Sequence, residues 1–172
     1  MTENYTPVAV TIPIAYLGGF QIGDYYVTGQ PADPLGFQAM ATAGVKSVIC
    51  LRDPTEPGFD LNEDSALLAL HISYINIPFP HGIDQSDFNQ RADLVRASLA
   101  AAAKPLLMHC STGDRASALW AVHLYADCGL PKEQAIQDGH LSGLANPAFV
   151  QLVQNYAAGS PPISLEKGAG RG

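Results

Sequence analysis

The sequence predicts an α/β protein with a central, mostly parallel sheet of about four to five strands flanked by helices. Short apolar runs of β-type residues alternate with segments in which apolar residues recur at helical spacing, an order typical of βα units. Of the 172 residues, 47% are hydrophobic and 15% are charged. The chain is therefore long enough and apolar enough to build one domain around a full core.

Three parts of the chain differ in composition. Residues 1–9 are expected to form an N-terminal arm, and residues 10–158 a single domain. Residues 159–172 are rich in Gly, Pro and Ser, so we expect a flexible C-terminal tail.

The first strand is predicted at 25–28, where the sequence is Tyr-Tyr-Val-Thr. A helix should follow, because Asp33 can supply an N-cap, Pro34 suits the first turn and Gly44 can end the helix. The next run, 48–51, is wholly apolar, as expected of a strand that is buried on both faces.

The middle of the chain repeats this order. A loop rich in carboxylates leads to a helix with leucines between 67 and 70, and then to a strand at 74–77. The next helix is predicted from apolar residues at spacings of four, three and four, namely Phe88, Ala92, Val95 and Leu99. A strand at 106–108 follows, and two later helices should open at Pro131 and at 146–147.

The most informative segment is the octet 108–115, Met-His-Cys-Ser-Thr-Gly-Asp-Arg. An apolar strand ends just before Cys110, a short loop with Gly113 follows, and Arg115 stands in the first turn of a helix. Loop N–H groups, the helix N-terminus and the arginine fork then converge on one point. The segment is predicted to bind an oxyanion, and the same positive field favours the nucleophilic thiolate form of Cys110.

Charge and cysteine content argue against several classes of protein. A formal net charge of −7 disfavours nucleic-acid binding and docking on an anionic membrane. Cysteines at 50, 110 and 128 are too few and too scattered for a disulfide scaffold or a zinc cluster. His71, His123 and His140 share no metal-ligand spacing. We expect a cytoplasmic protein with reduced thiols and no cofactor, because the chain has no long apolar run and no apolar leader. The oligomeric state is not indicated.

The segment 109–115, with the pattern HCxxGxR, resembles the phosphate loop of cysteine-dependent phosphatases. Those loops usually place five residues between the cysteine and the arginine, whereas this chain has four. The shorter loop resembles that of a bacterial subgroup similar to dual-specificity phosphatases, some of which are fused to metallo-β-lactamase-like hydrolases. The segments 28–31, 48–52 and 77–79 resemble the same subgroup, and the resemblance covers roughly 20–145. It implies a fold of the cysteine-phosphatase type.

The resemblance implies hydrolysis of a phosphorylated protein or a small phosphomonoester, without a metal or organic cofactor. Cys110 would attack phosphorus and form a phosphocysteine, while Arg115 and the loop N–H groups would bind the phosphate oxygens. His109 would orient the loop and help to keep Cys110 ionised. The implied substrate-binding residues are Ser111, Thr112, Gly113, Asp114 and Arg115.

Two features of the loop depart from the family's pattern. Many of these enzymes have Ser or Thr directly after the arginine, whereas this chain has Ala116 there and Ser117 one residue later. A helical step of about 100° turns Ser117 away from the site, so release of the cysteine should depend on Thr112 or Ser111, or be slow. Asp114 must point outward, because an inward carboxylate would repel phosphate.

The leaving group needs a proton from a separate loop upstream. Asp84 is the first candidate, His81 the second and Asp87 the third, with Asp53 as an outside candidate. A purely structural role explains two of them equally well, with Asp84 as a helix N-cap and Asp87 in the first helical turn.

Two other functions are compatible with the loop. Rhodanese-like sulfurtransferases have a similar Cys-x-x-Gly-x-Arg loop and would carry sulfur as a Cys110 persulfide. The long segment before residue 47 and the lack of a Gly-His-Ile-type turn before Ile75 favour the phosphatase. A catalytically impaired phosphate-binding module is the third hypothesis, because the loop is short and Ala116 lacks a hydroxyl.

Cys50 ends a buried strand that is expected beside the Cys110 strand. Resemblance to phosphatase-and-tensin-type enzymes makes Cys50 a candidate redox partner of Cys110. The alternative is a cysteine that only packs in the core.

Overall fold

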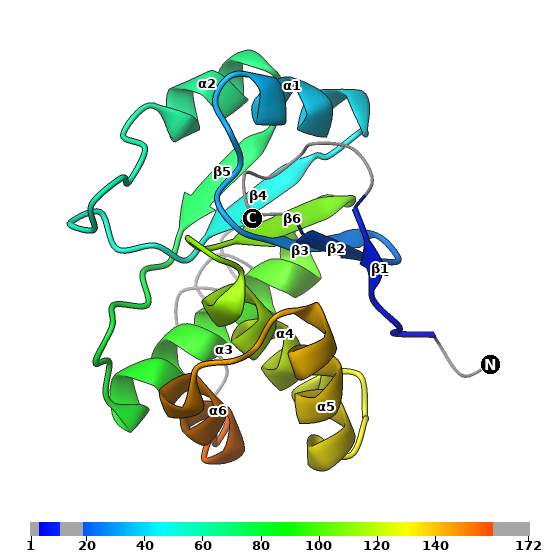
Figure 1. Cartoon of the computed structure of the whole chain (residues 1–172), viewed down its shortest axis with the longest axis vertical. Coiled ribbons are helices and arrows are strands. Elements are labelled where there is room, and N and C mark those ends of the chain that lie inside the picture. The colour runs from blue at the N-terminus through cyan, green and yellow to red at the C-terminus, as the bar shows by residue number, and fades with distance from the viewer. Residues whose placement is uncertain (1–3, 11–18, 160–172) are drawn as a thin grey trace, which may run out of the picture.

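A computed structural model describes residues 4–10 and 19–159, and a six-stranded sheet lies at its centre (Figure 1). The strands are β1 (Val8–Ala9), β2 (Gly19–Ile22), β3 (Tyr25–Thr28), β4 (Ser47–Cys50), β5 (Ser73–Asn76) and β6 (Leu106–His109). They are arranged in the order β1-β2-β3-β6-β4-β5. Neighbours among β3, β6, β4 and β5 pair in parallel, whereas β2 is antiparallel to β1 and β3. The α/β class with a mostly parallel sheet is confirmed.

Two strands at one edge of the sheet are not predicted from the sequence. β2 joins β3 through a tight turn in which Gly23 has a φ of 58°, and β1 then pairs with β2. β2 contains a glycine and β1 has only two residues, so neither carries a strong strand pattern. Pairing with β3 decides their structure. The sheet therefore has six strands rather than four to five, and Val8 and Ala9 of the expected arm belong to it.

Helices cover both faces of the sheet. Those of the described residues are α1 (Leu35–Thr42), α2 (Glu63–Ala69), α3 (Gln85–Ala101), α4 (Asp114–Ala126), α5 (Lys132–Ser142) and α6 (Pro147–Gln154). Figure 1 shows α1 and α2 on one face and α3 to α6 on the other. Within the ranges that the structure describes, no helix is both long enough and apolar enough to cross a membrane.

The ends of the helices follow the predicted signals with one exception. Asn146 caps α6 by accepting a hydrogen bond from the Ala148 N–H. Gly44, just beyond the end of α1, has a φ of 85°. The exception is Asp33: the N-cap position of α1 is Pro34 and has no side-chain hydrogen bond. The N-cap prediction for Asp33 is therefore wrong, because the helix begins one residue later. The predicted tail lies outside the described residues, apart from Gly159.

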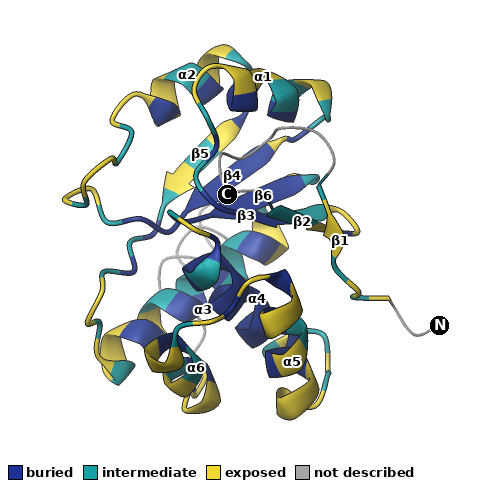
Figure 2. Cartoon of the chain, in the orientation of Figure 1, coloured by how far each residue is buried: buried dark blue, intermediate teal, exposed yellow. Residues whose placement is uncertain are grey.

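Each face of the sheet packs on its own apolar core, and burial is deepest at β4 and β6 (Figure 2). Beneath α1 and α2 the core includes Phe37, Met40, Val48, Leu67 and Leu107. Beneath α3 to α6 it includes Phe88, Leu99, Leu106, Met108, Leu119 and Trp120. β6 contributes to both cores because successive strand residues point to opposite faces. Each such side chain stabilises the fold by about 1.5–3 kcal/mol when fully buried, so β6 is held firmly from both sides.

The carboxyl ends of the parallel strands open at one edge of the sheet, where α/β proteins usually bind ligands. Backbone hydrogen bonds join the segments that leave these strands. The Gln30 N–H, after β3, donates to Ser111 O at 3.0 Å, and the Leu51 N–H, after β4, donates to His109 O at 2.8 Å. The segment that carries Cys110 is thus tied to the neighbouring loops on both sides.

Candidate active site

The loop 110–113 joins β6 to the buried helix α4 and surrounds the sulfur of Cys110. The Gly113 N–H donates a hydrogen bond to Cys110 Sγ over 3.1 Å, and Cys110 is only 1% exposed. Gly113 has a φ of 96°, a left-handed conformation that a residue with a Cβ adopts only under strain. The sulfur of Cys110 therefore lies against a backbone N–H at the N-terminus of α4.

Arg115 is buried in the first turn of α4, and its guanidinium is held from two sides. Nη1 and Nη2 donate to the two carboxylate oxygens of Glu56, the second at 3.0 Å. Nη1 also donates to Phe79 O at 2.9 Å. Burial lowers the pKa of Arg115, but the hydrogen bonds to Glu56 and the attraction of Cys110 outweigh it and raise the pKa overall. Arg115 is therefore a fixed cation beside the thiol.

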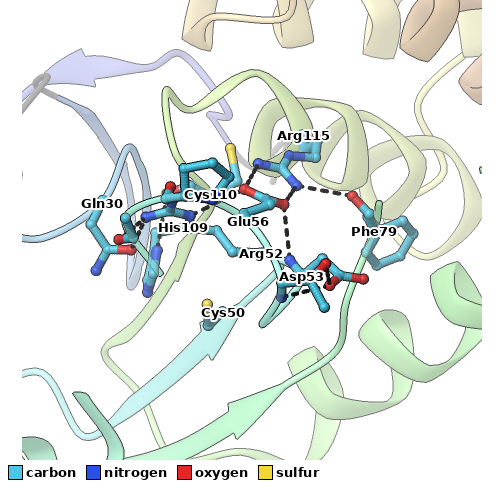
Figure 3. A network of polar contacts seen from close by, with 12 residues as sticks. Gln30, Cys50, Arg52, Asp53, Glu56, Phe79, His109, Cys110 and Arg115 are labelled. Atoms are coloured by element: carbon cyan, nitrogen blue, oxygen red, sulfur yellow. Dashed lines mark hydrogen bonds and ion pairs between the residues drawn. The ribbon is translucent and has the colours of Figure 1, made fainter. Parts of the chain in front are cut away.

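Glu56 lies on the loop after β4, and three groups donate to its carboxylate (Figure 3). Besides Arg115, the Asp53 N–H donates at 2.9 Å and Arg52 Nε at 3.2 Å. Burial raises the pKa of Glu56, but these hydrogen bonds lower it to about 2. Sequence reasoning did not single out Glu56 or Arg52. Glu56 is 59 residues from Arg115, and no local spacing indicates such a pair.

His109 forms a second buried ion pair on the other side of the loop. Its Nε2 lies 2.6 Å from Glu63 Oε1, and its Nδ1 lies 3.1 Å from Cys110 O. Both side chains are at most 1% exposed. Burial lowers the pKa of His109, but the contacts with Cys50 and Glu63 raise it to about 10. His109 therefore contacts the backbone of Cys110, its orienting role stays a prediction, and Glu63 is a partner that the sequence did not indicate.

A cavity of about 220 Å³ opens beside the loop. It is lined by Arg52, Glu56, Pro57, His81, Ser111, Thr112, Asp114, Arg115 and Phe149. The structure thus brings most of the predicted substrate-binding residues to one hollow. It adds the carboxylate of Glu56 and the aromatic ring of Phe149 from α6, which sequence reasoning missed.

The candidates for the general acid are separated by their positions. Asp84 is exposed and accepts a hydrogen bond from the Asp87 N–H at 2.8 Å, as the N-cap of α3. Asp53 accepts from the N–H and the hydroxyl of Thr55, and these two hydrogen bonds lower its pKa. His81 lines the cavity and packs against Phe149, with the ring centroids 6.3 Å apart. Of these candidates His81 lines the cavity and Asp84 does not, and the identity of the general acid stays a prediction.

Two further residues of the α4 segment behave as expected. Asp114 accepts hydrogen bonds from the backbone N–H groups of Ala145 and Asn146 at 2.8 to 3.2 Å. The carboxylate of Asp114 is therefore held at the turn before α6. The Ser117 hydroxyl lies 2.8 Å from both Gly113 O and Ser142 O, so its single proton is used inside the fold and not at the cavity.

Cys50 lies in a buried group with Glu63 and His109, whose side-chain ligand atoms are within 4.8 Å of one another. These residue types can bind a metal ion. Here, however, both ring nitrogens of His109 face oxygen acceptors, which explains the group by hydrogen bonding alone. The register pairs Cys50 with His109, and the three cysteines form no disulfide within the described part of the chain. A disulfide between Cys50 and Cys110 stays a prediction.

Comparison with known proteins places the chain in a family. Residues 23–126 match the model of the phosphatase-like domain of beta-lactamase hydrolase-like proteins. No curated protein matches the sequence significantly. A candidate phosphatase from Neisseria meningitidis has a similar structure, with 23% identity, a TM-score of 0.63 and coverage of 84% of this chain and 99% of that chain.

Two other solved structures share the fold. TpbA from P. aeruginosa, solved with phosphotyrosine, has 16% identity, a TM-score of 0.64 and coverage of 100% of both chains. The core catalytic domain of the PP-IP phosphatase of S. cerevisiae, solved with citrate, has 16% identity and a TM-score of 0.61, covering 87% of this chain and 91% of that chain. These likenesses support the fold, and the family model covers more than half of the chain. The chain therefore belongs to the phosphatase-like domain family of beta-lactamase hydrolase-like proteins.

Proposed function

We propose that the protein hydrolyses phosphomonoesters through a phosphocysteine formed on Cys110. The observation that carries this proposal is the way in which Arg115 is held beside the thiol. A guanidinium has five N–H donors in a rigid fork. Glu56 takes one N–H each from Nη1 and Nη2, and Phe79 O takes the second N–H of Nη1.

The two N–H groups of Arg115 that remain are Nε–H and the second Nη2–H. They lie on one edge of the planar group, in the geometry that binds two oxygens of a phosphate. Arg115 also interacts with the sulfur of Cys110, which supports placing a phosphate between this edge and the nucleophile. Glu56 thus orients the arginine without occupying the edge that binds the substrate.

In the first step the thiolate attacks phosphorus, the S–P bond forms and the bond to the leaving oxygen breaks. The loop N–H groups and Arg115 hold the negative charge of the transition state. We assign proton donation to His81, because it lines the cavity and an imidazolium can protonate the leaving oxygen. In the second step water attacks phosphorus and gives its proton to His81, and Cys110 leaves as the thiolate.

The second step is expected to be the slower one. Ala116 has no hydroxyl to assist the leaving sulfur, and the Ser117 hydroxyl is bonded within the fold. Ser111 and Thr112 line the cavity and are the hydroxyl groups left for this role. The predicted consequence is a burst of product equal to the enzyme concentration, followed by slower turnover.

The cavity and the relatives support a proposal for the substrate class. The anion site recognises any phosphomonoester, and the ring of Phe149 offers an apolar wall to the group that carries the phosphate. We therefore propose a phosphorylated protein or a small phosphomonoester as substrate, as with the phosphotyrosine bound by TpbA. A nucleophilic thiol has to stay reduced in order to act, which a reducing compartment ensures, and we propose the cytoplasm.

The test is a comparison of Cys110→Ser with Cys128→Ser, a matched control at a half-buried cysteine after α4. We expect Cys110→Ser to abolish hydrolysis of an aryl phosphate while retaining affinity for inorganic phosphate, and Cys128→Ser to be fully active. Rapid acid quench followed by mass spectrometry should find phosphate on Cys110 of the wild type. Full activity in Cys110→Ser would refute the mechanism. Thiocyanate formation from thiosulfate and cyanide, without phosphate release, would favour the sulfurtransferase.

A further inference from the structure

A buried glutamate on the first turn of α2 lies within hydrogen-bond distance of the histidine that precedes the nucleophile. Glu63 is 1% exposed and His109 is fully buried, and 2.6 Å separates Oε1 from Nε2. A carboxylate in such a place is strongly disfavoured unless it is paired. Here the pairing group is one residue from Cys110, and Glu63 itself does not line the cavity.

The hydrogen bonds of His109 determine where its protons lie. The Cys110 carbonyl can only accept, so Nδ1 carries a proton and donates to it over 3.1 Å. Glu63 accepts from Gln30 Nε2 at 3.1 Å through its second oxygen, and it stands at a helix N-terminus. Burial lowers the pKa of His109, but the contacts with Cys50 and Glu63 raise it above its ordinary value. The proton shared between Glu63 and His109 therefore resides on Nε2, and His109 is an imidazolium.

This arrangement acts on the loop through one peptide group. In a trans peptide the C=O and the following N–H point in opposite directions. Because His109 holds the Cys110 C=O on its own side, the Ser111 N–H is directed to the other side, toward the cavity that Ser111 lines. The Ser111 C=O is in turn fixed by the Gln30 N–H at 3.0 Å. Gln30 thus links the same glutamate to the next peptide of the loop.

We propose that Glu63 is a positioning residue, which acts through His109 to keep a positive charge beside Cys110 and to direct a loop N–H toward the bound anion. The inference rests on the proposed function, since it assigns a device for activating the same nucleophile. Glu63 touches neither the substrate nor the reacting atoms. Its effect is carried by one carboxylate, one imidazolium and one peptide group.

Other titratable groups lie near the Glu63–His109 pair and have to be considered in any test of pH dependence. Cys50 approaches His109 from β4, and Tyr74 of β5 contacts Cys50. Arg52, after β4, reaches Glu63 through Gln30, to which its Nη1 donates at 3.0 Å. Cys110 itself directly follows His109 in the chain. Cys50→Ala removes the group nearest to the pair and is used as a second background.

The experiment compares Glu63→Gln with Asp64→Asn, an exposed neighbour in the same helical turn. The rate of Cys110 alkylation by iodoacetamide is measured from about pH 5 to 9. Glu63→Gln should shift the profile to higher pH, with alkylation about tenfold slower near pH 6 and nearly unchanged near pH 9. The pH profile of kcat/KM for an aryl phosphate should shift in the same direction. Asp64→Asn should keep the wild-type profile, and Glu63→Gln should produce the same shift in the Cys50→Ala background.

Three outcomes would overturn the inference. The first is a Glu63→Gln profile of unchanged shape, scaled only by the folded fraction seen in thermal unfolding. The second is additivity between Glu63→Gln and His109→Asn, because a residue acting through His109 has no effect once His109 is gone. The third applies if Glu63→Gln does not fold. Glu63→Asp, which keeps the charge, is then measured instead, and a shifted profile in that variant would overturn the inference. Alkylation does not require turnover, so an inactive wild type would contradict the proposed function while leaving this readout intact.

Discussion

Two carboxylates hold the two cations of the active-site loop, and each does so from a different element. Glu56, on the loop after β4, orients Arg115, and Glu63, at the start of α2, pairs with His109. A buried cation without a partner is strongly disfavoured. The acidic partners therefore permit a positive site inside a chain whose formal net charge is −7.

Glu56 makes stability depend on acid pH. Its pKa is lowered from an ordinary 4.5 to about 2 in the fold. The stabilisation is thus complete above about pH 4.5 and is lost as pH falls toward 2. We expect Glu56→Gln to reduce the free energy of unfolding by about 2 kcal/mol at neutral pH, and this difference should shrink below pH 4.5. Urea unfolding at several pH values measures it, and a difference independent of pH would contradict the assignment.

The two leading candidates for the general acid predict opposite results. Asp84→Ala removes the N-cap of α3 and should lower the free energy of unfolding by about 1 kcal/mol, with kcat unchanged. His81→Gln should leave stability almost unaffected and lower kcat about 10²-fold or more for alkyl phosphates. Substrates whose leaving group needs no proton should be little affected. A large loss of kcat in Asp84→Ala, with such a leaving-group dependence, would restore the order suggested by the sequence.

At the level of elements, the site is a junction between a strand and a helix. β6 is buried on both faces, and every residue of α4 from Arg115 to Leu124 is buried. The loop between them has little freedom, because both of its anchors are part of the core. Precision at Cys110 and Arg115 is therefore provided by the packing of β6 and α4.

Gly113 allows the turn between these elements. Its φ of 96° makes a side chain unfavourable, and a Cβ there would lie 3.6 Å from Gly29 N and from Thr28 C. Gly113→Ala should reduce stability by about 1–2 kcal/mol and kcat/KM by at least about tenfold, because it displaces the N–H that faces Cys110 Sγ.

A matched control for that variant is Gly129→Ala, in the turn after α4. Gly129 also has a positive φ, 79°, but no atom lies within 4 Å of an added Cβ. It should show a similar loss of stability with normal kcat/KM. Equal losses of kcat/KM in both variants would mean that Gly113 matters only for folding. Thermal unfolding and steady-state kinetics on the two proteins decide between these outcomes.

At the level of the whole molecule, the acidic surface opposes an anionic substrate. With a net charge of −7, the long-range field repels a phosphate dianion, and salt screens this repulsion. We expect kcat/KM for a small aryl phosphate to rise about two- to threefold between roughly 0.02 and 0.2 M NaCl. A phosphopeptide flanked by lysines should show the opposite trend. If both substrates lose activity equally with salt, the local positive site dominates the approach.

The fold could be predicted where local sequence patterns specify the secondary structure. The parallel strands and the helices follow from apolar runs and spacing, and they appear where expected. The hairpin partners β1 and β2 do not follow, since their residues become strands only by pairing with β3. The choice between Asp84 and His81 was also beyond the sequence. Both residues lie on the loop before α3. Only tertiary packing places Asp84 at the end of the helix and His81 at the cavity.

The sequence by itself determined the loop and predicted its nucleophile and anion site, because Cys110, Gly113 and Arg115 lie within six consecutive residues and their spacing alone defines the loop. Only the tertiary structure decided which groups hold that loop. Glu63 is 46 residues from His109 and Glu56 is 59 from Arg115. Such pairs arise where parallel strands, distant along the chain, end at the same edge of the sheet. The side chains that meet there depend on strand order and register, and no local periodicity of the sequence specifies them.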